Sequence, residues 1–364
     1  MTQPYTRFHP GELWLDNHGV HLNAHGGGML FHEGRYYWHG EHKIAGTAGN
    51  SAHVGVHVYS SSDLLNWKDE GIALAVSPDP ESEICSGCIL ERPKVLFNAL
   101  TGKFVMWFHL ELKSSGYNSA RCGVASADRP EGPFHYHGSF RPNAGVWPQN
   151  VADADRKLLN PTERAHLKSL HLNGGEVPNY PPNLIYRRDF ESGQMSRDMT
   201  LFQDDDGTAY HIHASEDNGV LHISQLTPDY LQPAGIYRRY FEGEFNEAPA
   251  VLKRHGLYYL VGSGCTGWDP NPARSYMANS IWGPWTPLGN PCEGTPEEVE
   301  TTFHSQGTFL LSVPGNKNEF IFMADRWCPN DAIDGRYVWL PVEFEGDRLV
   351  LRWRESWTLD EFHG

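Results

Sequence analysis

Alternating apolar and polar positions recur along the chain in short runs that are separated by turn residues. Five segments share an apolar stretch, a turn rich in Gly, Asp or Asn, and a second stretch rich in aromatic residues. They are residues 29–41, 95–111, 200–216, 250–264 and 308–325. A two-residue period on both sides of a tight turn predicts a β-hairpin. We therefore expect five hairpins of similar build, spread over the whole sequence.

A second pattern follows most of these hairpins and predicts two further strands for each. Residues 58–74, 124–140 and 276–290 share a Ser or Asn, a turn, a Trp or Phe, and a closing Gly. Units of four strands and roughly 60–70 residues are typical of the blades of a β-propeller. We expect an all-β, five-bladed β-propeller that forms a single domain over residues 1–364. A two-sheet jelly roll is the alternative, but it does not predict five evenly built hairpins.

The spacing between the second and third hairpins is too wide for one blade. We place an insertion at about residues 141–190, and its "PNYPPN" stretch (178–183) favours a long loop over one face. The best helix candidate of the chain, residues 160–172, lies inside this insertion. The last predicted strands, 336–344 and 348–357, are expected to close the ring with the N-terminal segment.

Composition and charge narrow the range of partners. The formal net charge is −16, and no basic run is longer than a pair such as Arg187–Arg188, so nucleic acid and anionic membranes are poor partners. Aromatic residues make up 12% of the chain. Acidic groups together with many rings suit a neutral, polyhydroxylated ligand such as a sugar, although excess acid can also serve solubility alone.

Cysteines, apolar segments and the N-terminus give expectations about metals and location. Cys85 and Cys88 form a C-x-x-C pair without a second such pair, so we expect buried free thiols and no metal centre. No apolar run approaches the length of a membrane span, and the first residues lack the apolar core of a signal peptide. We expect a cytoplasmic protein, or a secreted or periplasmic one if a leader has been removed.

The propeller geometry predicts which residues meet at the axis. The first strand of each blade lines the central channel, so the residues just ahead of each hairpin should converge there. These residues are His25, Glu91, Asp198, Glu247 and Gln306. Three of them are carboxylates followed by small or apolar neighbours, and a partly buried acid costs stability unless it is paired or used.

At these positions the sequence resembles glycoside hydrolase family 43, a family of five-bladed propellers that act as inverting, exo-acting hydrolases. The stretches "SRDMTLFQDDDGTAY" and "NEAPAVLKRHGLYYL" are similar to its third-blade and fourth-blade motifs. The resemblance implies that Glu247 is the general acid and that Asp198 orients this acid and tunes its pKa. Inverting hydrolysis needs such an acid and a base on the opposite face of the sugar.

The first blade departs from the common family pattern, because "AHGGG" stands where most members carry a catalytic-base Asp. Together with "ERPKV" (91–95) and "SQGTF" (305–309), this departure resembles the subgroup of exo-β-1,3-galactanases and galactosidases. That resemblance implies that Glu91 and Gln306 take the place of the base, with Gln306 proposed to position water as an imidic acid. An amide has no useful acid–base pKa, so we expect Gln306 to position the water and Glu91 to bind the sugar or assist. Glu91 as the base is the alternative.

The substrate and a cofactor are less closely defined by the resemblance. Removal of terminal galactose from β-1,3-galactan or galacto-oligosaccharides is the expected activity. The alternatives are an α-L-arabinofuranosidase, β-galactofuranosidase or β-xylosidase of the same family, or a carbohydrate-binding propeller without activity. Some family members hold calcium on the axis near a fifth-blade His. Gln306 replaces that His here, so an axial Ca²⁺ is uncertain.

Several further residues are candidates for contacting the sugar. If His25 faces the axis, the glycines that follow it, Gly27 among them, remove side-chain bulk where the terminal sugar ring would sit. Glu41 and Glu216 end strands that run toward the predicted site. Trp268 lies in a loop that resembles a family loop bordering the pocket. These five residues are our candidate substrate contacts.

Overall fold

The computed structural model describes residues 3–170, 180–267, 269–315 and 318–363. It confirms the predicted five-bladed β-propeller. The first blade contains β1 (His25–His32), β2 (Arg35–His42), β3 (Gly55–Ser61) and β4 (Lys68–Ala75). The second contains β5 (Ile89–Asn98), β6 (Lys103–Glu111), β7 (Arg121–Ala127) and β8 (His135–Phe140). Each blade is an antiparallel sheet whose strands follow one another in chain order.

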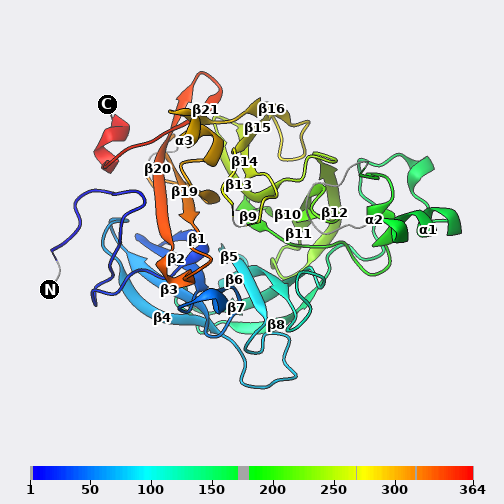
Figure 1. Cartoon of the computed structure of the whole chain (residues 1–364), viewed down its shortest axis with the longest axis horizontal. Coiled ribbons are helices and arrows are strands. Elements are labelled where there is room, and N and C mark those ends of the chain that lie inside the picture. The colour runs from blue at the N-terminus through cyan, green and yellow to red at the C-terminus, as the bar shows by residue number, and fades with distance from the viewer. Residues whose placement is uncertain (1–2, 171–179, 268, 316–317, 364) are drawn as a thin grey trace.

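The other three blades repeat this plan (Figure 1). The third contains β9 (Met199–Gln203), β10 (Ala209–Ser215), β11 (Val220–Leu226) and β12 (Pro233–Tyr240). The fourth contains β13 (Glu247–Arg254), β14 (Leu257–Ser263), β15 (Arg274–Ala278) and β16 (Thr286–Gly289). The fifth contains β18 (Gln306–Ser312), β19 (Phe320–Arg326), β20 (Arg336–Glu345) and β21 (Arg348–Arg352), and the short β17 (Cys292–Glu293) pairs in parallel with β21. The first strands of neighbouring blades contact one another, so they surround the axis.

The ring closes without exchange of strands between blades. The last two strands, β20 and β21, are outer strands of the fifth blade. The N-terminal segment meets the C-terminal one at a β-bridge, in which the backbone N–H of Phe8 donates to the carbonyl of Trp357 (2.8 Å) and that of Trp357 donates to the carbonyl of Phe8 (3.1 Å). Their rings stack with centroids 4.2 Å apart. An aromatic cluster that includes Trp38, Trp67 and Trp339 fills the space between the first and fifth blades.

The segment between β8 and β9 carries helices as well as loop. It contains the 3₁₀ turn η2 (Asp153–Asp155), α1 (Pro161–Ser169) and α2 (Ile185–Arg188), and it extends from the side of the propeller beside β12 (Figure 1). The helix predicted at residues 160–172 forms over Pro161–Ser169, and residues 171–172 of that prediction lie outside the described residues. Its N-terminus is fixed by a capping box between Asn160 and Glu163. Leu159, Leu167 and Ile185 give the segment a small core of its own.

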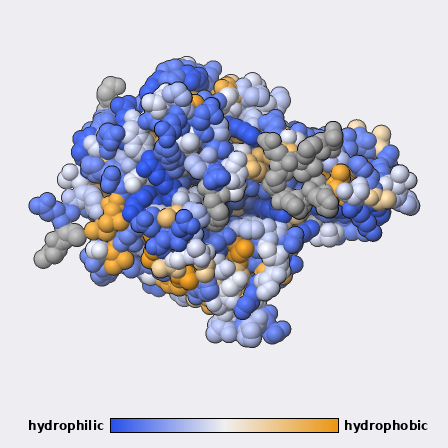
Figure 2. All heavy atoms as spheres, viewed as in Figure 1, coloured by the Kyte–Doolittle hydropathy of each residue, from blue (hydrophilic) through white to orange (hydrophobic). Residues whose placement is uncertain are grey.

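The remaining helical elements are short. They are α3 (Pro296–Thr301), which the sequence did not indicate, and the 3₁₀ turns η1 (Thr47–Asn50), η3 (Ala332–Asp334) and η4 (Leu359–His363). None of the helices in the described part of the chain has the length and apolar character that a membrane crossing requires. In Figure 2 the visible face is mostly hydrophilic, and apolar spheres gather only in small groups.

Candidate active site

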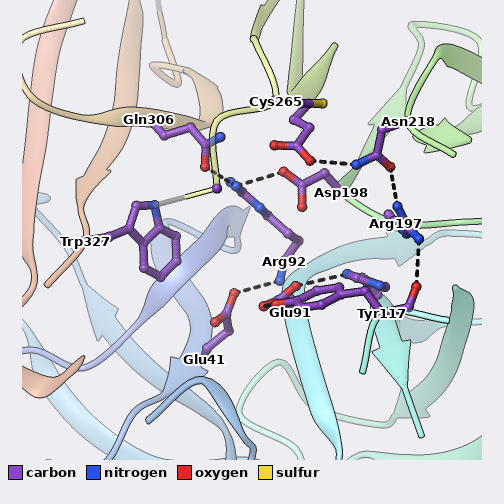
Figure 3. A pocket seen from close by; sticks show the side chains of 13 residues that line it. Glu41, Glu91, Arg92, Tyr117, Arg197, Asp198, Asn218, Cys265, Gln306 and Trp327 are labelled. Carbon is purple, nitrogen blue, oxygen red and sulfur yellow. Dashed lines mark hydrogen bonds and ion pairs between the residues drawn. The ribbon is translucent and has the colours of Figure 1, made fainter. Parts of the chain in front are cut away.

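A cavity of about 390 Å³ lies where the first strands of the blades begin. All five blades or their connecting loops contribute to its wall. The lining residues are Glu41, Glu91, Arg92, His109, Tyr117, Arg197, Asp198, Asn218, Glu247, Cys265, Gly267, Gln306 and Trp327. Figure 3 shows Arg92 near the centre, with Gln306 and Asp198 on one side and Glu41 and Glu91 on the other. The cavity thus gathers the four predicted catalytic residues Glu91, Asp198, Glu247 and Gln306.

A repeated irregularity of the first strands marks this end of the propeller. In four blades the first strand carries one residue more than its partner at its start: between His25 and Gly28, Glu91 and Lys94, Glu247 and Ala250, and Gly307 and Phe309. In three of them the residue after the axial position is left-handed, namely Gly26 (φ 60°), Arg92 (φ 57°) and Ala248 (φ 50°). Such bulges re-aim side chains beside active sites.

Glu247 combines deep burial with a nearby negative charge. Burial, followed by the charge of Asp198, raises the pKa of Glu247 from 4.5 to about 8, although Arg92 opposes this shift. Glu247 Oε1 accepts a hydrogen bond from Asn218 Nδ2 at 2.7 Å. The carboxyl group is therefore mostly protonated at neutral pH and held in one orientation, as a general acid requires.

Arg92 connects the third and fifth blades across the floor of the cavity. Its Nη2 lies 2.9 Å from Asp198 Oδ2 and donates to Gln306 Oε1 at 2.5 Å. The Nε2 of Gln306 donates to Ser263 Oγ at 2.8 Å, so the two ends of the amide are distinguished by their partners. Asp198 Oδ2 also accepts from the backbone N–H of Ala248, next to Glu247, at 3.0 Å. Asp198 is thus fixed beside the acid.

Glu91 belongs to a buried chain of alternating charges. Its Oε2 lies 3.0 Å from Nδ1 of His109, whose Nε2 lies 2.9 Å from Oε1 of Glu111. Burial lowers the pKa of His109, but the two carboxylates outweigh it and raise the pKa to about 9. Burial likewise raises the pKa of Glu91, but His109 outweighs it and lowers the pKa to about 2. Tyr117 donates its hydroxyl to Glu91 Oε1 at 2.8 Å, so Glu91 is an ionised, oriented acceptor.

Glu41 lines the cavity, as the sequence predicted for a sugar contact, but its oxygens are already engaged. Oε1 accepts from the backbone N–H of Arg92 at 2.9 Å, and Oε2 lies 2.5 Å from Lys43 Nζ. Its side chain is 3% exposed. Burial raises the pKa of Glu41, while Lys43 opposes the shift. Glu41 therefore also fixes the backbone of the bulge that presents Glu91 and Arg92.

His25 and Gly27 are not among the described residues that line the cavity. His25 is fully buried against the rings of Trp327 and Tyr337, with centroids 5.7 and 5.4 Å away. A Cβ at Gly27 would lie 2.4 Å from the carbonyl oxygen of His39. A Cβ at Gly26 would lie 2.1 Å from Glu41 Oε1, and this residue also needs its positive φ. The glycines thus make room for protein atoms rather than for a sugar ring.

Glu216 and Trp268 are the remaining two residues that the sequence predicts to contact the sugar. Glu216 is buried away from the cavity, where it pairs with Arg239 (2.5 and 2.8 Å) and His222 (2.7 Å). Two residues further along the same turn, Asn218 reaches Glu247 instead. Trp268 lies outside the described residues.

Sequence reasoning missed several wall residues. They are Arg92, His109, Tyr117, Arg197, Asn218, Cys265, Gly267 and Trp327. Arg92 directly follows Glu91, and its "ERPK" context was the available signal. Asn218 lies two residues after Glu216, which the sequence predicts at a strand end near the site. Tyr117 and Trp327 lie in loops, whose conformations no two-residue periodicity describes.

Among the described residues, one group in the cavity has metal-ligand spacing, and these residues do not fit calcium. Ligand atoms of Glu91, His109 and Asp198 lie within 4.8 Å of one another. Calcium prefers six to eight oxygen ligands. Here one donor is an imidazole that its two carboxylates keep protonated, and the guanidinium of Arg92 already neutralises Asp198. Buried cations of the chain itself take the place that a metal would need.

Comparisons with known proteins agree with this geometry. The model for glycosyl hydrolases family 43 matches residues 181–332. A family-43 β-1,3-galactosidase solved with galactodeoxynojirimycin is 48% identical, with a TM-score of 0.88, over 97% of this chain and 100% of that one. A variant of an exo-β-1,3-galactanase from Phanerochaete chrysosporium, solved with β-1,3-galactotriose, is 30% identical and has a TM-score of 0.77. The match covers 98% of this chain and 68% of that one.

A curated relative from Aspergillus niger, a β-D-galactofuranosidase, is 27% identical over 148 residues. That match spans 40% of this chain and 41% of the relative, so it covers less than half of either protein.

Proposed function

This chain belongs to glycosyl hydrolase family 43, and on that premise we propose that it is an inverting, exo-acting hydrolase that removes terminal galactose from β-1,3-linked galactan or galacto-oligosaccharides. The observation that carries the proposal is the buried Glu247, whose pKa burial and Asp198 raise, in a cavity whose wall also holds Glu91, whose pKa His109 lowers, and the amide of Gln306. The two galactose-active structures described above share the fold over nearly the whole chain.

Glu247 is assigned the proton transfer to the departing oxygen. With a pKa of about 8, roughly 90% of this carboxyl is protonated at pH 7, whereas an ordinary Glu would be almost fully ionised. Because Asn218 donates to Oε1 of Glu247, the orientation of the carboxyl group in the cavity is defined. As the glycosidic bond breaks, the proton moves to the leaving oxygen, and the ionised Glu247 left behind is then accessible for reprotonation by water.

Gln306 is assigned the orientation of the attacking water. Arg92 uses one lone pair of its Oε1, and the second can accept a hydrogen bond from water. As the water oxygen bonds to the anomeric carbon and the glycosidic C–O bond breaks, the surplus proton of that oxygen passes to solvent water. The transition state resembles an oxocarbenium ion, which water attacks readily once it is aligned. A carboxylate with a pKa of about 2 is a poor base at neutral pH, so we assign Glu91 to the sugar hydroxyls.

Exo action agrees with the contacts of Lys94 beside the cavity. Lys94 follows Arg92 by two residues on β5 and is buried. Its Nζ donates hydrogen bonds to the carbonyls of Gly26 (2.8 Å) and Arg92 (3.4 Å). Lys94 thus bridges the first and second blades beside Arg92. A chain end that binds in the cavity does not have to pass this bridge, as exo action requires.

Hydrolysis of β-1,3-galactobiose and β-1,3-galactotriose tests the proposal. We expect galactose as the monosaccharide product, released with the α-anomer appearing first in proton NMR spectra. Parallel assays with aryl arabinofuranoside, galactofuranoside and xyloside distinguish the other family activities. Binding of galacto-oligosaccharides without any product would contradict catalysis, and preferred cleavage of a furanoside or xyloside would contradict the assigned sugar.

A further inference from the structure

The turn between β10 and β11 has an unusual backbone. Glu216, Asp217 and Asn218 all adopt left-handed conformations, with φ of 53°, 56° and 66°. Residues other than glycine disfavour this region, and such conformations persist only where surrounding contacts hold them. All three residues are buried. The third presents its amide to Glu247, so the conformation of the turn determines where the hydrogen-bond donor to the acid lies.

Each side chain of the turn has its own anchor. Glu216 pairs with Arg239 of β12 and His222 of β11. Asp217 Oδ2 accepts from Arg188 Nη1 at 2.7 Å. Asn218 Oδ1 accepts from Arg197 at 3.3 Å. Three of these anchoring residues, Arg239, His222 and Arg197, belong to the third blade or its start, whereas Arg188 ends α2 in the segment inserted between β8 and β9.

The inserted segment touches the turn at further points. The hydroxyl of Tyr180 donates to the carbonyl of Glu216 at 2.9 Å. A Cβ at Gly219 would lie 2.3 Å from the Tyr180 ring, so only glycine leaves room for this contact. The carbonyl of Pro182 accepts from Arg239 Nη2 at 2.7 Å, which ties the segment to the partner of Glu216. Arg188 is itself fixed by Asp189 at 2.6 and 2.7 Å.

We infer that the inserted segment supports catalysis from outside the cavity: Arg188 is a positioning residue that holds the 216–218 turn so that Asn218 donates to Glu247. The inference rests on the proposed function and adds a role for a segment that is not part of the propeller blades. Arg188 is absent from the described cavity wall, so it acts through Asp217 and Asn218 rather than on the sugar.

Replacement of Arg188 by Met tests this role. The groups that face Glu247 are Asp198, Arg92, Arg197, Cys265 and Asn218, and all are retained in this variant. A donor to a carboxylate stabilises its ionised form. Looser contact with Asn218 should therefore move the alkaline limb of the activity profile upward by up to about one pH unit, with kcat roughly 3- to 10-fold lower and KM little changed.

The Arg187→Met variant is the matched control. Arg187 is the neighbouring arginine of α2 and is more deeply buried than Arg188, and it pairs with Glu163 (2.8 and 2.9 Å) inside the inserted segment. None of its described hydrogen bonds reaches the turn. We expect it to lower the melting temperature without moving the pH limb. Arg188→Lys, which keeps the charge beside Asp217, should restore most of the wild-type profile.

A double variant separates action through Asn218 from general damage. In the Asn218→Ala background, Arg188→Met should produce no further shift of the limb. Carbon-13 NMR titration of Glu247 gives the same pKa without substrate, so the result does not depend on hydrolysis; absence of hydrolysis in the wild type would contradict the proposed function instead. The inference is overturned if Arg188→Met leaves the Glu247 titration in place, or if its shift adds to that of Asn218→Ala. If Arg188→Met does not fold, Asp217→Asn replaces it in the same comparison.

Discussion

Replacing Glu247 by Gln should stabilise the fold at alkaline pH, because the ionised carboxyl is costly to bury. Its folded-state pKa of about 8 lies above the value of 4.5 expected in the unfolded chain. The stability that the protonated Glu247 contributes to the folded state is therefore complete below pH 4.5 and is lost as the pH rises toward 8. The loss amounts to about 5 kcal/mol, from the shift between these two values. Gln resembles the protonated side chain in size and can still accept from Asn218.

The difference between the two proteins isolates this one group, since every other titration is common to both. For a chain of this length we expect the E247Q variant to melt about 1 °C higher than the wild type at pH 5 and about 6 °C higher at pH 9. Differential scanning calorimetry across this range measures the gap. An equal gap at both pH values would refute the assigned burial and charge of Glu247.

Glu91→Gln is the matched control, because its shift has the opposite sign. The folded-state pKa of Glu91 is about 2, below the 4.5 of the unfolded chain, so its stabilisation is present above pH 4.5 and is lost as the pH falls toward 2. Removing this charge should lower stability at neutral and alkaline pH by about 3 kcal/mol. A rise in melting temperature at pH 9 in both variants would show that the two carboxyls do not differ as described.

Three further variants test neighbouring parts of the account. Asp198→Asn removes the second largest cause of the raised Glu247 pKa and takes away the negative charge beside Arg92. The alkaline limb of the kcat/KM profile should therefore move below pH 8. A pH profile with an unmoved limb would count against this coupling. Gln306→Ala should reduce kcat by about 10²- to 10³-fold while the circular dichroism spectrum stays unchanged, since the water loses its orienting group; near-normal turnover would remove Gln306 from the reaction. Glu216→Gln should destabilise the protein by about 3 kcal/mol in urea unfolding, because Arg239 loses its buried counter-charge; an unchanged midpoint would mean that the pair is not structural.

The blades and four residues of the cavity wall could be predicted because they depend on local patterns. A two-residue period between turn residues specifies a hairpin, and five similar hairpins specify a propeller whose first strands meet at the axis. The axial positions Glu91, Asp198, Glu247 and Gln306 follow from that arrangement alone, and all four line the cavity.

The remaining positions depend on tertiary contacts that no local pattern contains. The first blade shares the axial arrangement, yet His25 packs between Trp327 and Tyr337, because the bulge at Gly26 places the backbone against Glu41. No local pattern distinguishes Glu216 from Asn218 as the residue that reaches the acid. Only the left-handed turn and its distant ion pairs determine which side chain reaches the acid.

The most direct test of the central claim compares two substrates in the Glu247→Gln variant. β-1,3-Galactobiose needs a proton on its departing oxygen, whereas 2,4-dinitrophenyl β-galactoside has a leaving group that departs without one. If Glu247 is the general acid, kcat/KM for the disaccharide falls by about 10²- to 10⁴-fold, while that for the aryl galactoside falls far less. Equal losses on both substrates, or no loss on the disaccharide, would contradict the assignment of Glu247 as the proton donor.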